Sequence, residues 1–217
     1  MVSKSEIPIC IVPLSAHFLI RSHVTRRPWP YITFSQATQE YKVVLLGDGG
    51  VGKTTLIKRL LGVNSAQYYC TMGYEIHHLV LNTNRGAVKF EVWDTSGQEK
   101  PGELRQHYYE NSHGAIFMFG YNSRITFNSV TRWHRDIKQN NGDIPFALIA
   151  TFADEEPRKI KERDITRFRN KDMYRRTMLN EPFQMSTPTD SFAVLARPFL
   201  RLAERLMGME SETLHLV

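Results

Sequence analysis

One stretch constrains this chain more than any other: Gly47-Asp48-Gly49-Gly50-Val51-Gly52-Lys53-Thr54-Thr55. It fits the pattern G-x-x-x-x-G-K-[ST], in which glycines let successive backbone N–H groups close around phosphate oxygens. Lys53 supplies a positive charge for the outer phosphates, and the Thr54 hydroxyl is a hard oxygen ligand suited to Mg²⁺. The stretch therefore predicts a loop that binds a polyphosphate.

The residues on either side of this loop match the context that the pattern requires. Residues 41–46 form a short β-branched and aliphatic run typical of a buried strand. Behind the loop, apolar residues recur at helical spacing as Leu56, Ile57, Leu60 and Leu61. Strand, glycine loop and helix in this order place phosphate at a helix N-terminus, so we predict a nucleotide site.

Composition is that of a soluble globular protein, with 41% hydrophobic and 23% charged residues in a chain of 217. Two cysteines cannot form a disulfide framework and indicate a reducing compartment. The apolar stretch at residues 7–20 is too short to span a bilayer, so we expect no membrane segment.

The net charge of +6 equals the excess carried by one segment, residues 157–176. This segment has three acidic residues and nine basic ones: Arg158, Lys159, Lys161, Arg163, Arg167, Arg169, Lys171, Arg175 and Arg176. A solvated charged face is one interpretation, and docking to an acidic protein surface is another. Direct nucleic-acid binding is not expected, because no cluster of base-stacking aromatic residues accompanies the charge.

Two segments flank the expected domain, which we place at residues 41–208. In residues 1–40 the arginines follow the apolar stretch, an order opposite to that of a secretory signal peptide. We expect a disordered or loosely packed extension there, with a mitochondrial presequence as the alternative. Residues 209–217 are expected to form a short C-terminal tail.

The order of the predicted elements indicates an α/β fold. Strands are expected at residues 75–81, 87–93, 115–119 and 145–150, the first two joined in a hairpin. Helices are expected at residues 127–139 and near the C-terminus, where we place Pro198 in the first turn and Gly208 at the end. This alternation predicts a mostly parallel sheet with one antiparallel hairpin edge, helices on both faces and ligand at the carboxyl ends of the strands.

A second motif, Asp94-Thr95-Ser96-Gly97-Gln98-Glu99, directly follows the strand that ends at Trp93. An acid at a strand end beside a phosphate loop can hold Mg²⁺ through water, and the Gly97 N–H can reach a γ-phosphate. Gln98 offers both a donor and an acceptor, the groups needed to orient an attacking water.

These motifs resemble the small GTPases, and most closely the Ran family. The matching stretches are Gly47 to Thr55, Glu75-Ile76-His77, Thr83-Asn84-Arg85-Gly86, Trp93 to Lys100, Trp133-His134-Arg135-Asp136 and Arg197-Pro198-Phe199-Leu200. The resemblance covers roughly residues 41–208. It implies a P-loop NTPase fold and a switch that binds GTP and hydrolyses it to GDP, with Lys53 and Gln98 as catalytic residues and Mg²⁺ as cofactor.

The resemblance also implies the remaining parts of the cycle. Residues 62–73 correspond to switch I, in which Tyr68 belongs to the nucleotide site and the Thr71 hydroxyl reaches Mg²⁺. The implied metal site also includes Thr54 and, through a water molecule, Asp94. Residues from 94 to about 109 correspond to switch II. Implied partners are importin-β-type transport receptors, an exchange factor and a GTPase-activating protein. The basic segment matches the receptor-facing patch of the family, and the implied protein is a monomer of the nucleus and cytoplasm.

The base-recognition loops depart from the family pattern. Thr151-Phe152-Ala153-Asp154 replaces N-K-x-D, so Asp154 is retained for the guanine N–H donors. The change to Thr151 is expected to lose an amide that ties the loops together, and Phe152 can stack on the base in place of the lysine stem. Ser186-Thr187-Pro188 replaces S-A-K, and the Thr187 N–H can still meet guanine O6. We also expect no acidic C-terminal tail of the family's kind.

These departures leave two interpretations open. Each hydrogen bond lost to a buried polar group costs about 1–3 kcal/mol, so we expect weaker guanine binding than in relatives. The intact phosphate and magnesium residues favour a working GTPase. Phe152 and Pro188 favour a degenerate module that binds transport receptors without a nucleotide cycle. Altered base choice is less favoured, because Asp154 is retained.

Overall fold

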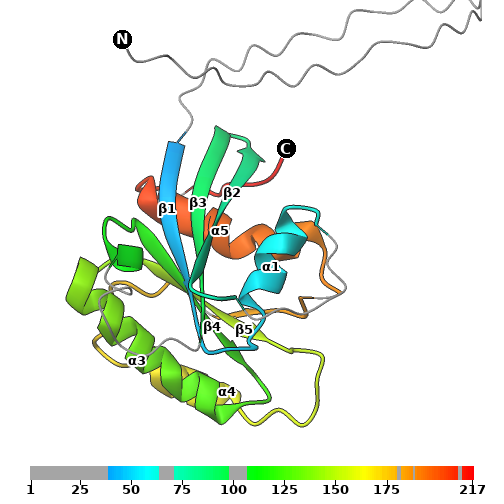
Figure 1. Cartoon of the computed structure of the whole chain (residues 1–217), viewed down its shortest axis with the longest axis vertical. Helices are drawn as coiled ribbons and strands as arrows, with labels where there is room; N and C mark the ends of the chain where they lie inside the picture. The colour runs from blue at the N-terminus through cyan, green and yellow to red at the C-terminus, as the bar shows by residue number, and fades with distance from the viewer. Residues whose placement is uncertain (1–38, 64–70, 98–106, 180–181, 188, 210–211) are drawn as a thin grey trace, which may run out of the picture. The chain divides into compact units, whose positions relative to one another are not determined.

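The computed structural model describes residues 39–63, 71–97, 107–179, 182–187, 189–209 and 212–217 (Figure 1). Its strands are β1 (Gln39–Leu46), β2 (Tyr74–Thr83), β3 (Gly86–Thr95), β4 (Gly114–Gly120), β5 (Phe146–Thr151) and β6 (Phe183–Gln184). Its helices are α1 (Lys53–Leu60), α3 (Arg124–Asn141), α4 (Glu162–Arg169) and α5 (Phe192–Leu206). The expected extension at residues 1–40 lies outside the described residues except for Gln39 and Glu40, which begin β1.

The six strands form one sheet in the order β2-β3-β1-β4-β5-β6. Every neighbouring pair is parallel except the β2–β3 hairpin at the edge, as the sequence predicts. The register of β1 with β3 sets Leu45 beside Asp94. The glycine loop that follows β1 and the acid at the end of β3 therefore meet at the same edge of the sheet, where ligands of such folds bind.

Helices cover both faces of the sheet, which is therefore buried on both sides (Figure 1). One apolar cluster joins alternate residues of β1 to α1 and α5: Val43, Leu45, Leu56, Ile57 and Phe199. The other cluster joins the intervening residues of β1 to α3 and α4: Val44, Leu46, Phe127, Trp133 and Phe168. The continuous apolar run of β1 follows from this two-sided burial.

The last helix begins earlier than the sequence predicts. Ser191 is the N-cap of α5, so Pro198 lies inside the helix rather than in its first turn. A proline inside a helix removes a backbone hydrogen bond, but Pro198 and its neighbour Phe199 are buried against the sheet. The burial of this side of α5 outweighs the preference of proline for the first turn of a helix. Gly208 ends the helix with φ 68°, as expected of a C-terminal glycine.

The described part of the expected tail packs on the domain. Leu214 is buried, and its N–H donates to the Glu204 carboxylate at 2.7 Å. Leu216 forms a bridge with Thr83 at the tip of the β2–β3 hairpin. The segment thus joins α5 to the edge strand.

The basic segment contains a helix, α4, that the sequence analysis did not predict. Ile165 and Phe168 point into the core, while all nine basic side chains of the segment are exposed. The spacing of two apolar residues in a run of charges is too short a signal to predict a helix. No helix in the described ranges is both long enough and apolar enough to cross a membrane.

His134 on α3 is a buried histidine packed among aromatic rings. Its ring lies edge-on to Tyr174 at 4.8 Å and close to Phe146 at 5.3 Å between centroids. Its Nδ1 has no hydrogen-bond partner in the part of the chain that the structure describes. Burial lowers the pKa of His134 from its ordinary value of 6.5, and the nearby charge of Lys138 lowers it further.

Lowering the pH should therefore destabilise the fold through His134. Below about pH 6.5 the unfolded chain takes up the proton before the folded chain does. The free energy of unfolding should fall there with a slope of up to about 1.4 kcal/mol per pH unit. His134→Phe should remove this slope in urea unfolding between pH 5 and 7, whereas His78→Phe, at an exposed strand position, should keep it. An unchanged slope in His134→Phe would contradict this role.

Candidate nucleotide site

The loop after β1 takes a shape that only glycines allow. Gly47 has φ 154°, and a Cβ there would lie 2.4 Å from the backbone oxygen of Met118 on β4. Gly52 has φ 93° and is the N-cap of α1. The loop thus lies directly on the neighbouring strand and delivers its N–H groups to the start of a helix, where an anion is favoured.

Lys53 is held inside this loop. Its side chain is only 6% exposed. Its ammonium group donates to the carbonyl oxygens of Gly47 at 2.8 Å and Asp48 at 3.1 Å. The charge is therefore already positioned where the loop closes, as binding of a polyphosphate requires.

The three residues predicted for magnesium meet in one cluster. Thr54 at the start of α1 donates to Asp94 Oδ2 at the end of β3 with a distance of 2.6 Å. The hydroxyl of Thr71 shares a hydrogen bond of 2.8 Å with that of Thr54. Thr71 and Asp94 lie 17 and 40 positions after Thr54 in the sequence. The fold thus brings three oxygen groups from distant parts of the chain together.

The chemistry of this cluster fits Mg²⁺. Asp94 is fully buried, and its Oδ1 has no hydrogen-bond partner among the described residues. Burial raises the pKa of Asp94, and the hydrogen bond from Thr54 and the charge of Lys53 only partly oppose this. A buried carboxylate with an unused oxygen beside two hydroxyls is the hard oxygen set that Mg²⁺ prefers.

Thr151 at the end of β5 still ties the loops together, contrary to the expectation. Its side chain is 1% exposed, and its hydroxyl lies 2.9 Å from the Val51 carbonyl oxygen and 3.1 Å from that of Phe119. The hydroxyl therefore links the phosphate loop to β5 and β4. The expected loss of a tie was wrong, because a short hydroxyl side chain can reach the backbone oxygens of both neighbours.

Phe152 has an unusual backbone conformation for a large side chain. Its φ is 56°, in the left-handed region. Its ring lies close to Gly120, where a Cβ would come within 3.1 Å of the ring. The absence of a side chain at residue 120 makes room for the aromatic ring in the base loop. Asp154, two residues further on, is exposed and accessible to a ligand.

The second base loop is held to the first by backbone and side-chain hydrogen bonds. The N–H of Ala153 donates to the Met185 carbonyl oxygen at 3.2 Å. The Asp190 carboxylate accepts from the N–H of Ser186 at 2.8 Å. Ser186 and Thr187 are both buried. The two loops therefore form one unit at the carboxyl ends of β5 and β6.

Comparison with known protein families identifies the family to which a chain with this site belongs. A family model described as "Ras family" matches residues 42–191, more than half of the chain. The chain belongs to the Ras family. It is therefore a small GTPase, a switch that binds GTP and hydrolyses it to GDP, and proteins of this family typically bind Mg²⁺ with the nucleotide.

The described ends of the two segments that are predicted to be switches lie close to the phosphate loop and to each other. A Cβ on Gly97 would lie 2.2 Å from the backbone nitrogen of Gly49 in the phosphate loop. The N–H of Ser96 donates to the Gly73 carbonyl oxygen at 2.7 Å. The start of the predicted switch II therefore lies against the phosphate loop and is hydrogen-bonded to the end of the predicted switch I.

Asp48 has a role that the sequence analysis missed. Its carboxylate accepts from the indole N–H of Trp133 at 3.1 Å and from Arg132 at 3.2 Å. The side chain thus anchors the phosphate loop of this Ras-family chain to α3. The only signal in the sequence was that Trp133 belongs to a stretch that matches the Ran family. Asp48 and Trp133 are 85 positions apart, so no local pattern predicts their contact.

The other predicted site residues have simpler outcomes. Gly50 has φ 78°, Val51 is buried behind the loop, and Thr55 is exposed in the first turn of α1. Tyr68, Gln98 and Pro188 lie outside the described residues, so their assignments stay predictions.

The tie made by Thr151 can be tested by removing only its hydroxyl. Thr151→Val leaves the volume nearly unchanged and leaves the Val51 and Phe119 oxygens without this donor. The free energy of unfolding should fall by about 1–3 kcal/mol in chemical denaturation. GDP should also dissociate faster, because the phosphate loop loses its link to β5. Thr151→Asn should restore both properties, and wild-type values in Thr151→Val would contradict the assignment.

Proposed function

We propose that this chain is a Ran-like switch of nucleocytoplasmic transport whose GTP form binds importin-β-type receptors. The observation that most supports this proposal is that all nine basic side chains of residues 157–176, around α4, are exposed. Two of the three acids there are already paired, Asp164 with Arg124 and Asp172 with Arg175. Of the nine basic residues, Arg158 is paired with Glu156 and Arg175 with Asp172, and the segment keeps an excess of exposed positive charge that suits an acidic partner surface.

Hydrolysis would proceed by attack of a water on the γ-phosphate. Gln98 would orient this water, and Lys53 and the loop N–H groups would stabilise the charge that develops on the phosphate oxygens. Asp94, Thr54 and Thr71 would hold Mg²⁺, which neutralises phosphate charge when bound. The contact of Gly97 with the phosphate loop supports this arrangement, because residue 98 follows directly.

The role of Gln98 is tested by Gln98→Leu. Single-turnover hydrolysis of bound GTP should slow at least about tenfold, since the water loses its orienting group. GTP affinity should be unchanged, because the phosphate loop is intact. Lys53→Met provides the contrast and should abolish binding. Hydrolysis by Gln98→Leu at the wild-type rate would show that another group positions the water.

The receptor proposal predicts a binding event that depends on both nucleotide and charge. Pull-down with an importin-β-type receptor should retain the GTP-loaded protein at least about tenfold better than the GDP-loaded protein. Arg163→Glu with Arg167→Glu should weaken this binding, and added salt should weaken it in the wild type. Arg163→Glu and Arg167→Glu should each weaken binding when introduced singly, whereas Arg197→Glu, at an exposed position on α5, makes the same charge change outside the segment and should not. Binding that ignores these α4 changes would refute the surface.

A degenerate receptor-binding module is the second candidate. Phe152 in place of lysine and its left-handed backbone favour it, because the base loop is built differently from the family pattern. Such a module would bind the receptor equally with and without nucleotide. Isothermal calorimetry with GTP and Mg²⁺ separates the two, since the switch requires saturable guanine-nucleotide binding and the module does not.

A further inference from the structure

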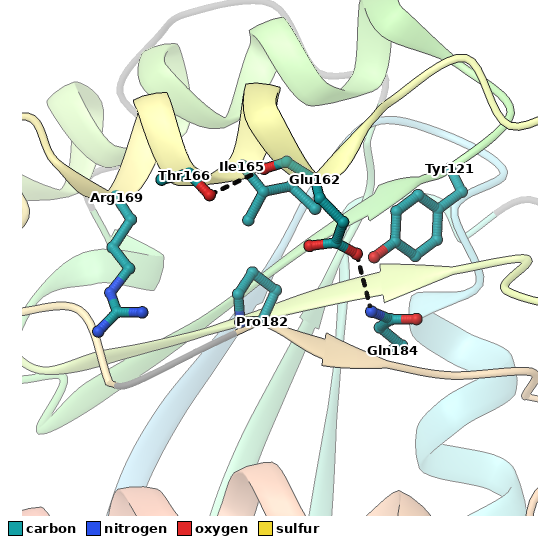
Figure 2. Close-up of a pocket in the computed structure, with 7 residues that line it drawn as sticks. All are labelled: Tyr121, Glu162, Ile165, Thr166, Arg169, Pro182 and Gln184. Atoms are coloured by element: carbon teal, nitrogen blue, oxygen red, sulfur yellow. Dashed lines mark hydrogen bonds between the residues drawn. The ribbon is translucent and has the colours of Figure 1, made fainter.

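A small pocket opens between α4 and β6, away from the phosphate loop (Figure 2). Its volume is about 50 Å³. One water needs roughly 10–15 Å³ by this measure, so the pocket has room for a few waters or for one small polar group. Polar atoms of Tyr121, Glu162 and Gln184 lie at one end, and Ile165 and Pro182 form its apolar walls.

The hydroxyl of Tyr121 is a buried polar group without a partner. The side chain is 1% exposed, and its oxygen has no hydrogen bond to any described residue. Figure 2 shows the hydroxyl directed toward the Glu162 carboxylate and the Gln184 amide. Burial, and next the charge of Glu162, raises the pKa of Tyr121 to about 12, so the hydroxyl is neutral. Buried hydroxyls nearly always have partners, which points to an occupant of the pocket.

Glu162 differs from the other acids of the basic segment. Asp164 and Asp172 are ion-paired, whereas Glu162 has no ion pair with any residue in the described ranges. Among the residues that the structure describes, its carboxylate accepts only from the amide nitrogen of Gln184, at 3.3 Å. That bond turns the amide nitrogen of Gln184 toward the carboxylate, so the acceptors at this end of the pocket are the Glu162 carboxylate and the Tyr121 hydroxyl.

We propose that this pocket binds a primary ammonium group. Such a group has N–H donors for the Glu162 carboxylate and the Tyr121 hydroxyl, and its positive charge is attracted to the carboxylate. Its first methylenes would contact Ile165 and Pro182. An anion would face the Glu162 charge directly, which disfavours it although Arg169 also lines the pocket. The proposal does not depend on the transport role.

Titration of the full chain with ethylammonium chloride tests the site. At constant ionic strength, NMR signals of α4 and β6 should shift saturably with ethylammonium. Tetramethylammonium, which has the charge but no N–H donor, should produce no saturable shift. Glu162→Gln should weaken binding at least about tenfold, and Tyr121→Phe should weaken it several-fold, because each removes one acceptor.

Asp172→Asn is the matched control, since it removes the same charge from the same segment outside the pocket. It should bind ethylammonium like the wild type. Equal effects of ethylammonium and tetramethylammonium, unchanged binding in Glu162→Gln, or no saturable shift at all would overturn the proposal and leave a pocket that holds only water.

The ammonium group can come from a free amine or from a lysine side chain of a partner. An acidic peptide with one central lysine distinguishes these sources, with the same peptide carrying acetyl-lysine as control. Tighter binding of the lysine peptide than of ethylammonium, lost on acetylation, would identify a partner side chain. Binding of ethylammonium with no gain from the peptide would identify a small amine, and either result supports the site.

Discussion

The hydrogen bond from Thr54 to Asp94 is the interaction on which the site depends. At 2.6 Å it joins the start of α1 to the end of β3, and it does so around a carboxylate that is fully buried. Burying a carboxylate is costly unless hydrogen bonds or a cation compensate it. One oxygen of Asp94 accepts from Thr54, and the other has no hydrogen-bond partner in the part of the chain that the structure describes. The fold thus keeps a place for positive charge at the edge of the sheet where the phosphate loop begins.

The part of the nucleotide site that faces the phosphates could be predicted from the sequence, because the residues that form it are close together in the chain. The glycines, Lys53 and Thr54 occupy neighbouring positions, and the strand and helix around them have clear periodicity. The contacts of the two base-recognition loops could not be predicted in this way, because they join residues that are far apart in the sequence. The bond from Thr151 to Val51 spans 100 residues, and nothing in the sequence shows that a hydroxyl can replace an amide there. Pro198 was placed wrongly for a similar reason, since burial of α5 outweighs local helix rules.

The structure changes the energetic expectation for guanine binding. The predicted weakening counted Thr151 as a lost tie between the loops, but its hydroxyl lies within hydrogen-bonding distance of two backbone oxygens. Each such bond to a buried group is worth about 1–3 kcal/mol when its loss leaves a partner unsatisfied. Within the described part of the first base loop, the remaining departure from the family pattern is at Phe152, where the side chain that packs on the base has changed. Shape, rather than a missing hydrogen bond, is the property of the base loop that differs.

The side of the molecule formed by α4 is connected to the base loops. The N–H of Tyr121 donates to the Thr151 carbonyl oxygen at 3.0 Å, and the Tyr121 carbonyl oxygen accepts from Lys159 and Ile160. Gln184, on the opposite wall of the α4–β6 pocket, lies two residues before Ser186. A group bound in that pocket would therefore touch residues joined to both base loops. Binding on the basic face can therefore bias how the base is held. The same connection reaches the phosphate loop through the Thr151 hydroxyl and Val51, while Asp48 anchors that loop to α3.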